Sequence, residues 1–418
     1  MINLDDVRDK MKNIERQKLL AKHPYKIFQD KDGRWKTTVL DKTKKNGRRL
    51  IAKKSLQDLE DIIIAYYADK EDKKYIKDNL YTLNEIFPLW LEYKASQTNS
   101  TSYPRRILVD WDKYYKDTDI VNEVLIDLTY LKLDKWAHDI IKQYSMTKRQ
   151  YYNMSIIMRQ CLDYACEPEI GALKENPFRR VRIKTNLFTK QAKPKSSSQV
   201  FMTDEQFKMS KIAKEKIAEH PWCTTPLMIL LNFQLGLRIS ELCAIKWSDI
   251  ENNYLHIQRI EIEQYHIENN NGKLISVSDG LTIVPYTKTE AGEREVYLND
   301  EAKKILRQIK KTNMEYGYYD DDYIYIKSQG ACRGTTKALS KYLYDLCVES
   351  GITAKSSHKI RKTYISSLFD KGININTIRE QAGHEDEQTS LNNYCFDQHT
   401  DDYIEAKLES AMNKNICI

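Results

Sequence analysis

The chain has 418 residues, which is more than one ordinary domain uses, so we expect two or three domains. Its 41% hydrophobic and 30% charged residues are typical of a globular protein with real cores. No run of about 18 apolar residues occurs, which argues against a membrane-spanning helix, and the opening stretch (MINLDDVRDKMKN) lacks the apolar core of a signal peptide. The eight cysteines are scattered without a C-x-x-C pair, so we expect reduced thiols in a cytosol and no zinc site.

Positive charge is concentrated at the start of the chain. Residues 1–54 contain 17 Lys or Arg against 7 Asp or Glu, whereas the rest of the chain contains 50 against 53. This asymmetry predicts an N-terminal module that binds a polyanion. A solvated basic tail is the alternative interpretation.

The first segment, residues 1–75, is predicted to form a three-stranded sheet followed by a helix. Short β-rich runs are separated by Asp32-Gly33 and Asn46-Gly47, which are strong turn signals, and Ser55 is a suitable helix N-cap. Basic and aromatic residues interleave along the sheet, a pattern that suits a DNA groove, although some of the aromatic residues are needed for so small a core. The expected DNA-contact residues here are Arg34, Trp35, Lys36, Lys44, Lys45, Arg48 and Arg49.

The second segment, residues 78–188, is predicted to be all-helical. Residues 82–95, 131–144 and 147–167 each carry apolar side chains at three-to-four spacing, and Asn176-Pro177 is expected to close the last helix. A basic run that follows supplies two further candidate DNA contacts, Arg179 and Arg180. Charged helix surfaces are usually only solvated, so this segment alone indicates no more than a helical bundle.

Residues 189–199 (TKQAKPKSSSQ) are rich in serine and lysine without apolar periodicity, and they predict a flexible linker. The third segment, residues 200–418, is expected to be mainly helical with a β-rich insert near residues 254–298. The predicted fold class is therefore multidomain and mainly α: a small sheet plus helix, a helical domain, and a mixed, mainly-α domain with a β insert.

Arg238 lies within an unusually apolar stretch, LNFQLGLRISELCAIKW. An arginine among so many apolar residues is costly unless it meets an anion. Glu241 is three residues further on, on the same face of a helix, where its carboxylate could orient the guanidinium. A surface Arg–Glu pair is the alternative interpretation.

His358 and Arg361 are three residues apart in SSHKIRKTYISSL, so a helix would direct both to one place. The guanidinium is a planar hydrogen-bond donor for anions, and the imidazole exchanges protons near neutral pH. The pattern H-x-x-R is also common by chance.

Two further local patterns contain residues that could bind an anion or transfer a proton. His384 follows Gly383 and precedes Tyr394 by ten residues, and Lys288 lies in VPYTKTEAGEREVYL, which is predicted to form two β-type runs joined by a turn. A lysine at a hairpin tip is usually only solvated, and Lys273 in the same insert is an alternative to Lys288.

Together these residues match what a phosphodiester needs from a protein. Negative charge grows on the non-bridging oxygens in the pentacoordinate transition state, and Arg238 and Arg361 suit that role. A phenol with a pKa of about 10 requires activation by cations or a base before it can act as a nucleophile. The leaving 5′ oxygen needs a proton, for which Lys288 and a histidine are candidates.

The motifs GLRISEL, HKIRKTYISSLFDKG and GHEDEQTSLNNY resemble the catalytic domain of the tyrosine recombinases, the phage-integrase family. The resemblance matches Arg238, Lys288, His358, Arg361 and His384 to the family's catalytic positions and Tyr394 to its nucleophile. It implies a helical core-binding domain at residues 78–188 and a catalytic domain at 200–418. The basic module of residues 1–75 resembles the arm-site binding domains of integrases from phages and conjugative transposons. Lys362 departs from the second histidine that many relatives have there, and Ala382 from a common leucine.

The resemblance implies that Tyr394 attacks the scissile phosphate and forms a 3′-phosphotyrosyl link, with no metal or other cofactor. It implies double-stranded DNA as partner, at core sites and arm sites, and a homotetramer on the DNA. It allows for an excisionase or a host DNA-bending protein, and it implies a bacterial cytoplasmic, nucleoid-associated protein with no membrane contact.

Other classes remain open from the sequence. A topoisomerase or a chromosome-dimer resolvase would share the chemistry but normally lacks the basic front module. A catalytically idle DNA-binding relative is disfavoured because no catalytic position is lost. A metal-dependent nuclease using His358, His384, Glu385 and Asp386 is a further alternative, although this spacing fits no common ligand pattern.

Overall fold

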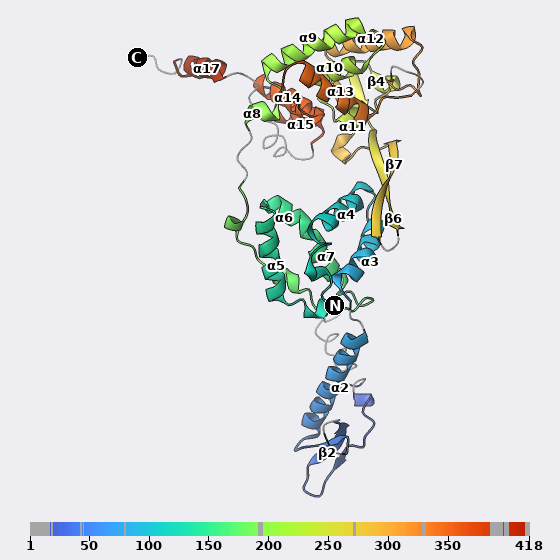
Figure 1. Cartoon of the computed structure of the whole chain (residues 1–418), viewed down its shortest axis with the longest axis vertical. Coiled ribbons are helices and arrows are strands. Elements are labelled where there is room, and N and C mark those ends of the chain that lie inside the picture. The colour runs from blue at the N-terminus through green and yellow to red at the C-terminus, as the bar shows by residue number, and fades with distance from the viewer. Residues whose placement is uncertain are drawn as a thin grey trace, which may run out of the picture. The chain divides into compact units, whose positions relative to one another are not determined.

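The computed structural model describes most of the chain, which divides into two compact units, residues 1–190 and 191–418 (Figure 1). The described residues are 17, 20–41, 44, 46–78, 81–190, 195–270, 273–327, 332–384, 396 and 401–413, without the side chains of 68–78, 401, 402, 404 and 411–413. No described helix is long and apolar enough to cross a membrane.

The first unit begins with a small antiparallel sheet. Its strands, in the order β1-β2-β3, are β1 (Phe28–Gln29), β2 (Trp35–Leu40) and β3 (Arg48–Lys53), and helix α2 (Leu56–Asp78) follows. Gly33 and Gly47 adopt φ of 77° and 63° at the two turns, which explains why glycine follows Asp32 and Asn46. The Ser55 hydroxyl accepts a hydrogen bond from the Asp58 N–H (3.1 Å), as its predicted N-cap role requires.

One face of this sheet is covered by α2. Val39 and Ile51 on the sheet and Leu59 and Ile63 on the helix form the buried core, and Trp35 packs against it. Because paired residues in an antiparallel sheet share a face, the register Lys36↔Ala52 and Leu40↔Arg48 directs these four side chains away from α2. The predicted sheet-plus-helix module is thereby confirmed, with one face left to solvent.

The rest of the first unit is helical, as predicted. Its α-helices are α3 (Leu83–Ser96), α4 (Ser102–Tyr114), α5 (Tyr130–Gln143), α6 (Lys148–Met154) and α7 (Ile156–Tyr164), and its 3-10 helices are η1 (Asp119–Val121), η2 (Leu125–Asp127), η3 (Pro177–Arg180) and η4 (Thr185–Leu187). Stacked rings tie α3 to α4, since the Phe87 and Trp111 centroids lie 3.8 Å apart.

Two boundaries in this region differ from the prediction. The single helix expected over 147–167 is two helices, α6 and α7, which meet at Ser155. Asn176-Pro177 does not end α7 but begins η3, where the Asn176 side chain accepts a hydrogen bond from the Phe178 N–H (2.9 Å). Proline lacks an N–H and has a fixed φ, so it serves as well at the start of a helix as after its end.

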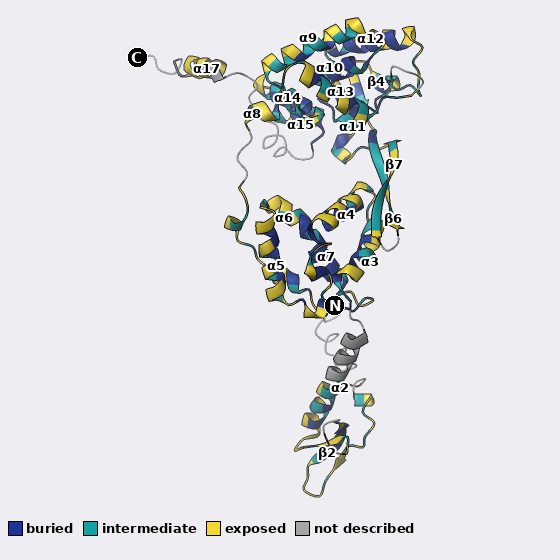
Figure 2. Ribbon diagram, viewed as in Figure 1, coloured by how far each residue is buried: buried dark blue, intermediate teal, exposed yellow. Residues whose placement is uncertain are grey.

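The second unit contains a buried core surrounded mostly by helices (Figure 2). The α-helices are α8 (Ser196–Gln199), α9 (Thr203–Glu219), α10 (Thr225–Leu235), α11 (Ile239–Leu242), α12 (Asp300–Glu315), α13 (Thr336–Glu349), α14 (Ser357–Asp370), α15 (Ile375–Ala382) and α17 (Asp401–Asn413). Helix α10 is central and apolar on all sides, with Met228, Leu231 and Leu235 fully buried. α8 lies within the predicted linker, and residues 191–194 fall outside the described part.

Strands of the second unit form two separate antiparallel sheets. The sheet β4-β5-β8 comprises β4 (Ile250–Glu251), β5 (Tyr254–Ile257) and β8 (Arg294–Tyr297), and β6 (Ile260–Asn270) pairs with β7 (Lys273–Val284). The predicted β insert is therefore present. The predicted hairpin over residues 284–298 is wrong, because β7 and β8 belong to different sheets and the 3-10 helix η6 (Glu290–Gly292) lies between them.

Candidate active site

Most of the predicted catalytic residues lie on three short segments of the second unit that pack together. α14 packs on α10 and α15, and α15 packs on β8, so the ends of α10, α14 and α15 meet next to α11 (Figure 1). These segments carry Arg238, His358, Arg361 and His384. The structure thus gathers residues that are up to 146 positions apart in the chain.

A glycine turn positions the first arginine. Gly236 ends α10 in the left-handed conformation (φ 61°), and a Cβ atom there would lie 2.2 Å from the Tyr364 ring. Only glycine fits both the backbone angle and the close approach of Tyr364. Arg238 follows as the N-cap of α11, with its side chain 27% exposed.

Glu241 orients the Arg238 guanidinium, as expected from the sequence, and it also binds the Arg238 backbone. The carboxylate of Glu241 accepts from the Arg238 backbone N–H (2.9 Å) and from its guanidinium Nη1 (2.7 Å). Arg238 Nη2 donates to the carbonyl of Gly383 (3.1 Å), which links α11 to the loop that carries His384. Glu241 is 1% exposed, so this pair is buried on one side rather than a surface ion pair.

Arg361 is more deeply buried than Arg238. It is 1% exposed and donates to the carbonyl of Gly236 (3.0 Å) and to that of Ala382. These two carbonyls end α10 and α15, so Arg361 fastens both ends to α14. Helix C-termini carry partial negative charge, which favours a cation in this position.

A third arginine, Arg294, was not singled out from the sequence. Its Nη2 and Nη1 donate to both Glu241 oxygens (2.9 and 3.2 Å), its Nη1 also to the Gly292 carbonyl (2.8 Å), and its Nε to the Gln381 carbonyl (2.9 Å). A signal was present: Arg294 shares strand parity with the apolar Val296 and Leu298, so the alternation points it inward. An inward arginine requires a carboxylate, and Glu241 provides it.

Burial and the nearby cations together determine the pKa values of Glu241 and of the two histidines. Burial by itself would raise the pKa of Glu241, but Arg294, Arg361 and Arg238 together lower that pKa to about 2. Burial, then Arg361 and Arg238, lower the pKa of His384 to about 3. Partial burial and the cations beside it, Lys362 first, lower the pKa of His358 to about 4. Both imidazoles are neutral at pH 7, and the site as a whole is positive.

Two lysines extend this positive region along α14. The Lys359 and Lys362 ammonium groups both donate to the Gln199 side-chain oxygen, at 2.7 and 2.9 Å. Gln199 lies at the end of α8, so the chain just after residues 191–194 is tied to the helix that carries His358 and Arg361. Burial, followed by a neighbouring lysine, lowers the pKa of both lysines.

Lys288 is exposed in the connection between β7 and η6, not at a hairpin tip. The loop that holds it is fixed to the cluster, because the Gly292 carbonyl accepts from Arg294. Lys273 begins β7 and pairs with Asn270, next to the hairpin turn. The two candidate lysines therefore lie at opposite ends of β7.

Tyr394 lies outside the described residues, as do Glu385 and Asp386. Phe396, two positions beyond Tyr394, is described: its N–H donates to the Ser366 hydroxyl of α14 (3.2 Å), and the Lys362 ammonium lies 4.7 Å from its ring centroid. Within the described ranges, no group of three His, Cys, Asp or Glu side chains could hold a metal ion.

The predicted DNA-contact residues of the sheet module differ in their surroundings. Arg34, Lys44, Arg48 and Arg49 are exposed, and Arg48 also packs over the Tyr25 ring at 4.9 Å. Lys36 faces away from α2 and pairs with Asp30. Trp35 packs against the module's core, and Lys45 lies outside the described residues.

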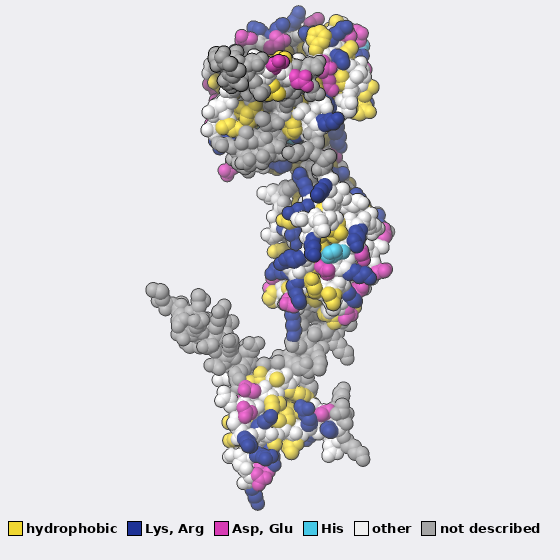
Figure 3. All heavy atoms as spheres, turned by 90° about the vertical axis from the view of Figure 1, so that its left-hand side faces the viewer, with side chains coloured by type: hydrophobic (Ala, Val, Ile, Leu, Met, Phe, Trp, Pro, Cys, Tyr) yellow, Lys and Arg dark blue, Asp and Glu magenta, His cyan; other side chains and the backbone are white. Residues whose placement is uncertain are grey.

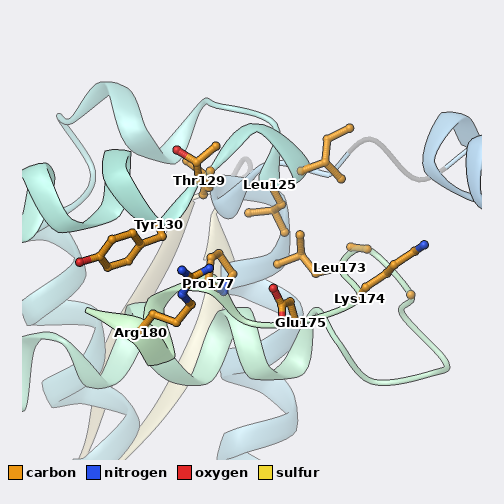
Figure 4. A pocket seen from close by; sticks show the side chains of 12 residues that line it. Leu125, Thr129, Tyr130, Leu173, Lys174, Glu175, Pro177 and Arg180 are labelled. Carbon is orange, nitrogen blue, oxygen red and sulfur yellow. The ribbon is translucent and has the colours of Figure 1, made fainter. Parts of the chain in front are cut away.

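Arg179 and Arg180 are exposed on η3 in the first unit. Arg179 pairs with Asp163 (2.9 Å), and the Arg180 guanidinium lies 5.1 Å from the Tyr130 ring centroid. Figure 4 shows both Tyr130 and Arg180 beside Pro177 at a hollow of about 310 Å³, which is lined mainly by apolar side chains. Figure 3 shows Lys and Arg side chains gathered over the helical part of this unit; exposed examples are Lys132, Lys135, Lys142, Lys148 and Arg149.

The chain is similar in sequence to several known proteins. Residues 199–400 match the phage integrase family. The chain is 25% identical to the ICEBs1 integrase of Bacillus subtilis over 329 residues, covering 72% of this chain and 81% of that one. It is 28% identical to the integrase of Staphylococcus phage L54a over 189 residues, 43% of this chain, and this match spans about half (49%) of that relative.

Two solved structures share the fold. One is the Tn1549 transposon integrase in complex with a circular intermediate DNA (TM-score 0.56, 18% identity, 79% of this chain and 99% of that one). The other is a lambda integrase dimer bound to a COC′ core site (TM-score 0.53, 14% identity, 89% and 95%). At this identity the likeness concerns the fold alone. The family match and the sequence relatives identify residues 199–400 as a phage integrase domain, the catalytic domain of a tyrosine recombinase.

Proposed function

We propose that the chain is a site-specific integrase that cuts and rejoins DNA strands through a 3′-phosphotyrosyl link at Tyr394, and so integrates and excises a mobile element. The observation that carries this proposal is the arginine cluster, in which Arg238 and Arg361 are fixed by Glu241 and by helix-end carbonyls beside two neutral histidines. Such an arrangement suits a phosphodiester, because its donors are already oriented before negative charge develops.

In the proposed reaction, the Tyr394 oxygen forms a bond to phosphorus while the bond from phosphorus to the 5′ oxygen breaks. Arg238 and Arg361 bind the non-bridging oxygens. Lys288 protonates the leaving 5′ oxygen, and His358 and His384 position the phosphate and relay the phenol proton. A bound phosphate brings negative charge next to these imidazoles, which raises their pKa from the values in the DNA-free protein.

The 5′ hydroxyl of a partner duplex then reverses the step and restores a phosphodiester. One phosphoester replaces another, so the exchange needs no ATP. Strand exchange between two duplexes requires four protomers. The lambda integrase tetramer bound to a Holliday junction, which shares the fold (TM-score 0.52), supports the same assembly here.

We assign the DNA contacts by module. Residues 1–75 bind arm sites through the exposed cations of the sheet, residues 78–188 bind core sites, and residues 200–418 carry the chemistry. An excisionase or a host DNA-bending protein would act with the arm-binding module, and the DNA substrate would place the protein at the bacterial nucleoid. A chromosome-dimer resolvase is less well supported, since that class normally lacks a basic front module such as residues 1–75.

The test measures covalent adduct formation when the full chain is incubated, in EDTA, with a nicked suicide DNA that carries the element's own end. We expect a covalent protein–DNA adduct from the native protein and none from Tyr394→Phe. Tyr364→Phe is the matched control: this tyrosine is on the catalytic helix, and burial raises the pKa of its phenol, so the variant should still form the adduct. An adduct that persists in Tyr394→Phe would assign the nucleophile to another residue.

A further inference from the structure

Arg294 connects three parts of the proposed active site without reaching its surface. Its side chain is 5% exposed, and all three guanidinium nitrogens are engaged, with Glu241 on α11, Gly292 in η6 and Gln381 on α15. Gly383 packs directly on it, since a Cβ atom there would lie 3.0 Å from Arg294 Cδ and 2.7 Å from the Ala291 carbonyl oxygen. Arg294 is thus the more enclosed of the two guanidinium groups that bind Glu241, since its side chain is 5% exposed against 27% for Arg238.

Glu241 is the shared partner through which Arg294 can act. One carboxylate, 1% exposed, lies between the guanidinium groups of Arg238 and Arg294. If Arg294 were absent, Glu241 would lose the two hydrogen bonds from Arg294 and keep the one from the Arg238 guanidinium. A buried charge that loses one partner draws more strongly on the other, so Arg238 would turn from the phosphate towards Glu241.

The charge of the cluster also depends on Arg294. Arg238, Arg294 and Arg361 against Glu241 amount to three positive charges and one negative, a net charge of +2. A phosphodiester carries one negative charge, and its pentacoordinate transition state carries two. Arg294 therefore contributes one of the positive charges that offset the second negative charge of the transition state.

We propose that Arg294 is a positioning residue of DNA strand cleavage: it holds Glu241, and through Glu241 the Arg238 guanidinium, in the orientation that the phosphate needs. It also completes the charge of the cluster without touching DNA. This inference rests on the proposed function. The competing view is that Arg294 only fastens α11, η6 and α15 together as part of the fold.

Two substitutions separate geometry from charge. Arg294→Lys keeps the charge, but an ammonium cannot serve both Glu241 oxygens and two carbonyls in the planar pattern of a guanidinium. Arg294→Met removes the charge as well. The matched control is Arg259→Lys, which alters another buried pair of the same unit, Arg259–Asp249 (2.6 Å), outside the cluster.

The experiment measures adduct formation by the full chain on suicide DNA under single-turnover conditions, with DNA affinity and thermal unfolding of each variant. We expect Arg294→Lys to slow adduct formation about 10- to 100-fold and Arg294→Met about 100- to 1,000-fold. DNA affinity should stay within about threefold, because most DNA contacts go to phosphates elsewhere on the protein. Arg259→Lys should form the adduct within about threefold of the native rate.

The dependence of the cleavage rate on pH provides a second measurement. It should not change if Arg294 only stabilises the fold. Burial lowers the pKa of His384 most, followed by Arg361 of α14, Arg238 at the start of α11 and Arg294 of β8, and His358 of α14 also acts on it. Arg294→Met removes one of these cations, so the acidic limb of the rate–pH profile should move to higher pH. Arg294→Lys keeps the charge, so the limb should stay in place although the rate falls.

Each outcome decides the matter. Native-like adduct formation by Arg294→Lys would overturn the inference and leave the proposed function standing. A loss of adduct that parallels loss of DNA binding and of the thermal transition would assign Arg294 to the fold alone. If Arg294→Met does not fold, Arg294→Lys decides. Absence of adduct from the native protein would overturn the proposed function and this inference with it.

Discussion

The arginines of the catalytic cluster and those of the N-terminal sheet are held in opposite ways. Arg361 is 1% exposed, Arg238 has a 27% exposed side chain, and both are hydrogen-bonded to backbone carbonyls. Arg34, Arg48 and Arg49 of the sheet module are exposed. Fixed donors lose no further freedom when a phosphate arrives, whereas exposed ones act mainly by displacing counterions. We therefore expect the same residue type to serve chemistry in one region and affinity in the other.

The largest expected effect comes from disturbing the turn that holds the fixed arginines. Gly236→Ala would place a methyl group 2.2 Å from the Tyr364 ring in a left-handed backbone. We expect a loss of about 3 kcal/mol in the free energy of unfolding, from backbone strain and overpacking together, and loss of strand cleavage. Urea denaturation and the suicide-DNA assay measure the two effects.

Gly372→Ala is the matched control for that substitution. Gly372 has nearly the same φ (71°) at the end of α14, but a Cβ atom there meets nothing within 4 Å. It should lose only the backbone contribution, about 1 kcal/mol, and still cleave DNA. Equal losses at the two glycines would mean that the Tyr364 contact does not constrain the cluster.

The second prediction compares one histidine from each region under acid. In the folded protein the pKa of His384 is about 3, against about 6.5 in the unfolded chain, so only the unfolded chain gains this proton between pH 6.5 and 4.5. Stability should therefore fall as the pH is lowered through this window, and His384→Gln should remove about 2 kcal/mol of that fall. Hydrogen exchange of peptides from residues 224–384 in the full chain, at each pH, measures it.

His23→Gln provides the comparison in the sheet module. Burial alone lowers the pKa of His23, and its ring contacts Thr37 (2.6 Å) rather than arginines. The change in pH dependence, followed in peptides from residues 20–66, should have the same sign and be smaller. A larger change at His23 would contradict the view that the arginine cluster adds to burial in lowering the pKa of His384.

The smallest expected effect is in the exposed cations. Arg48→Ala should weaken binding to arm-site DNA and reduce the slope of log affinity against log salt concentration by about 1, because it removes one phosphate contact. Adduct formation on a DNA that carries only the core site should be unchanged. Fluorescence anisotropy over a salt series measures the slope, and an unchanged slope would remove Arg48 from the DNA-facing side.

Trp35→Ala tests whether arm-site binding requires the folded sheet module. Trp35 packs against the core of Val39, Ile51, Leu59 and Ile63, so its loss should unfold the module rather than remove one contact. Arm-site binding should then disappear while core-site cleavage continues.

Much of the fold followed from local patterns. Gly33 and Gly47, the Ser55 cap and the spacing of Leu59 and Ile63 were sufficient for the sheet-plus-helix module, because turns and caps depend on neighbouring residues. Boundaries were less predictable: Asn176-Pro177 suits the start of η3 as well as the end of a helix. The pairing of β7 with β6 has a local signal, because only Asn271-Gly272 separates the two strands in the sequence. The pairing of β8 with β5 depends instead on segments distant in sequence, which local β propensity does not encode.

The sequence by itself determined the types and spacing of the reacting groups: Arg238 with Glu241, His358 with Arg361, and His384 ten residues before Tyr394. Only the tertiary structure showed that Glu241 is shared with Arg294, that Arg361 holds the ends of α10 and α15, and that Lys288 lies in the connection between β7 and η6. Spacing along a helix identifies neighbours one turn apart. The charge and orientation of a buried cluster depend on which distant segments pack around it.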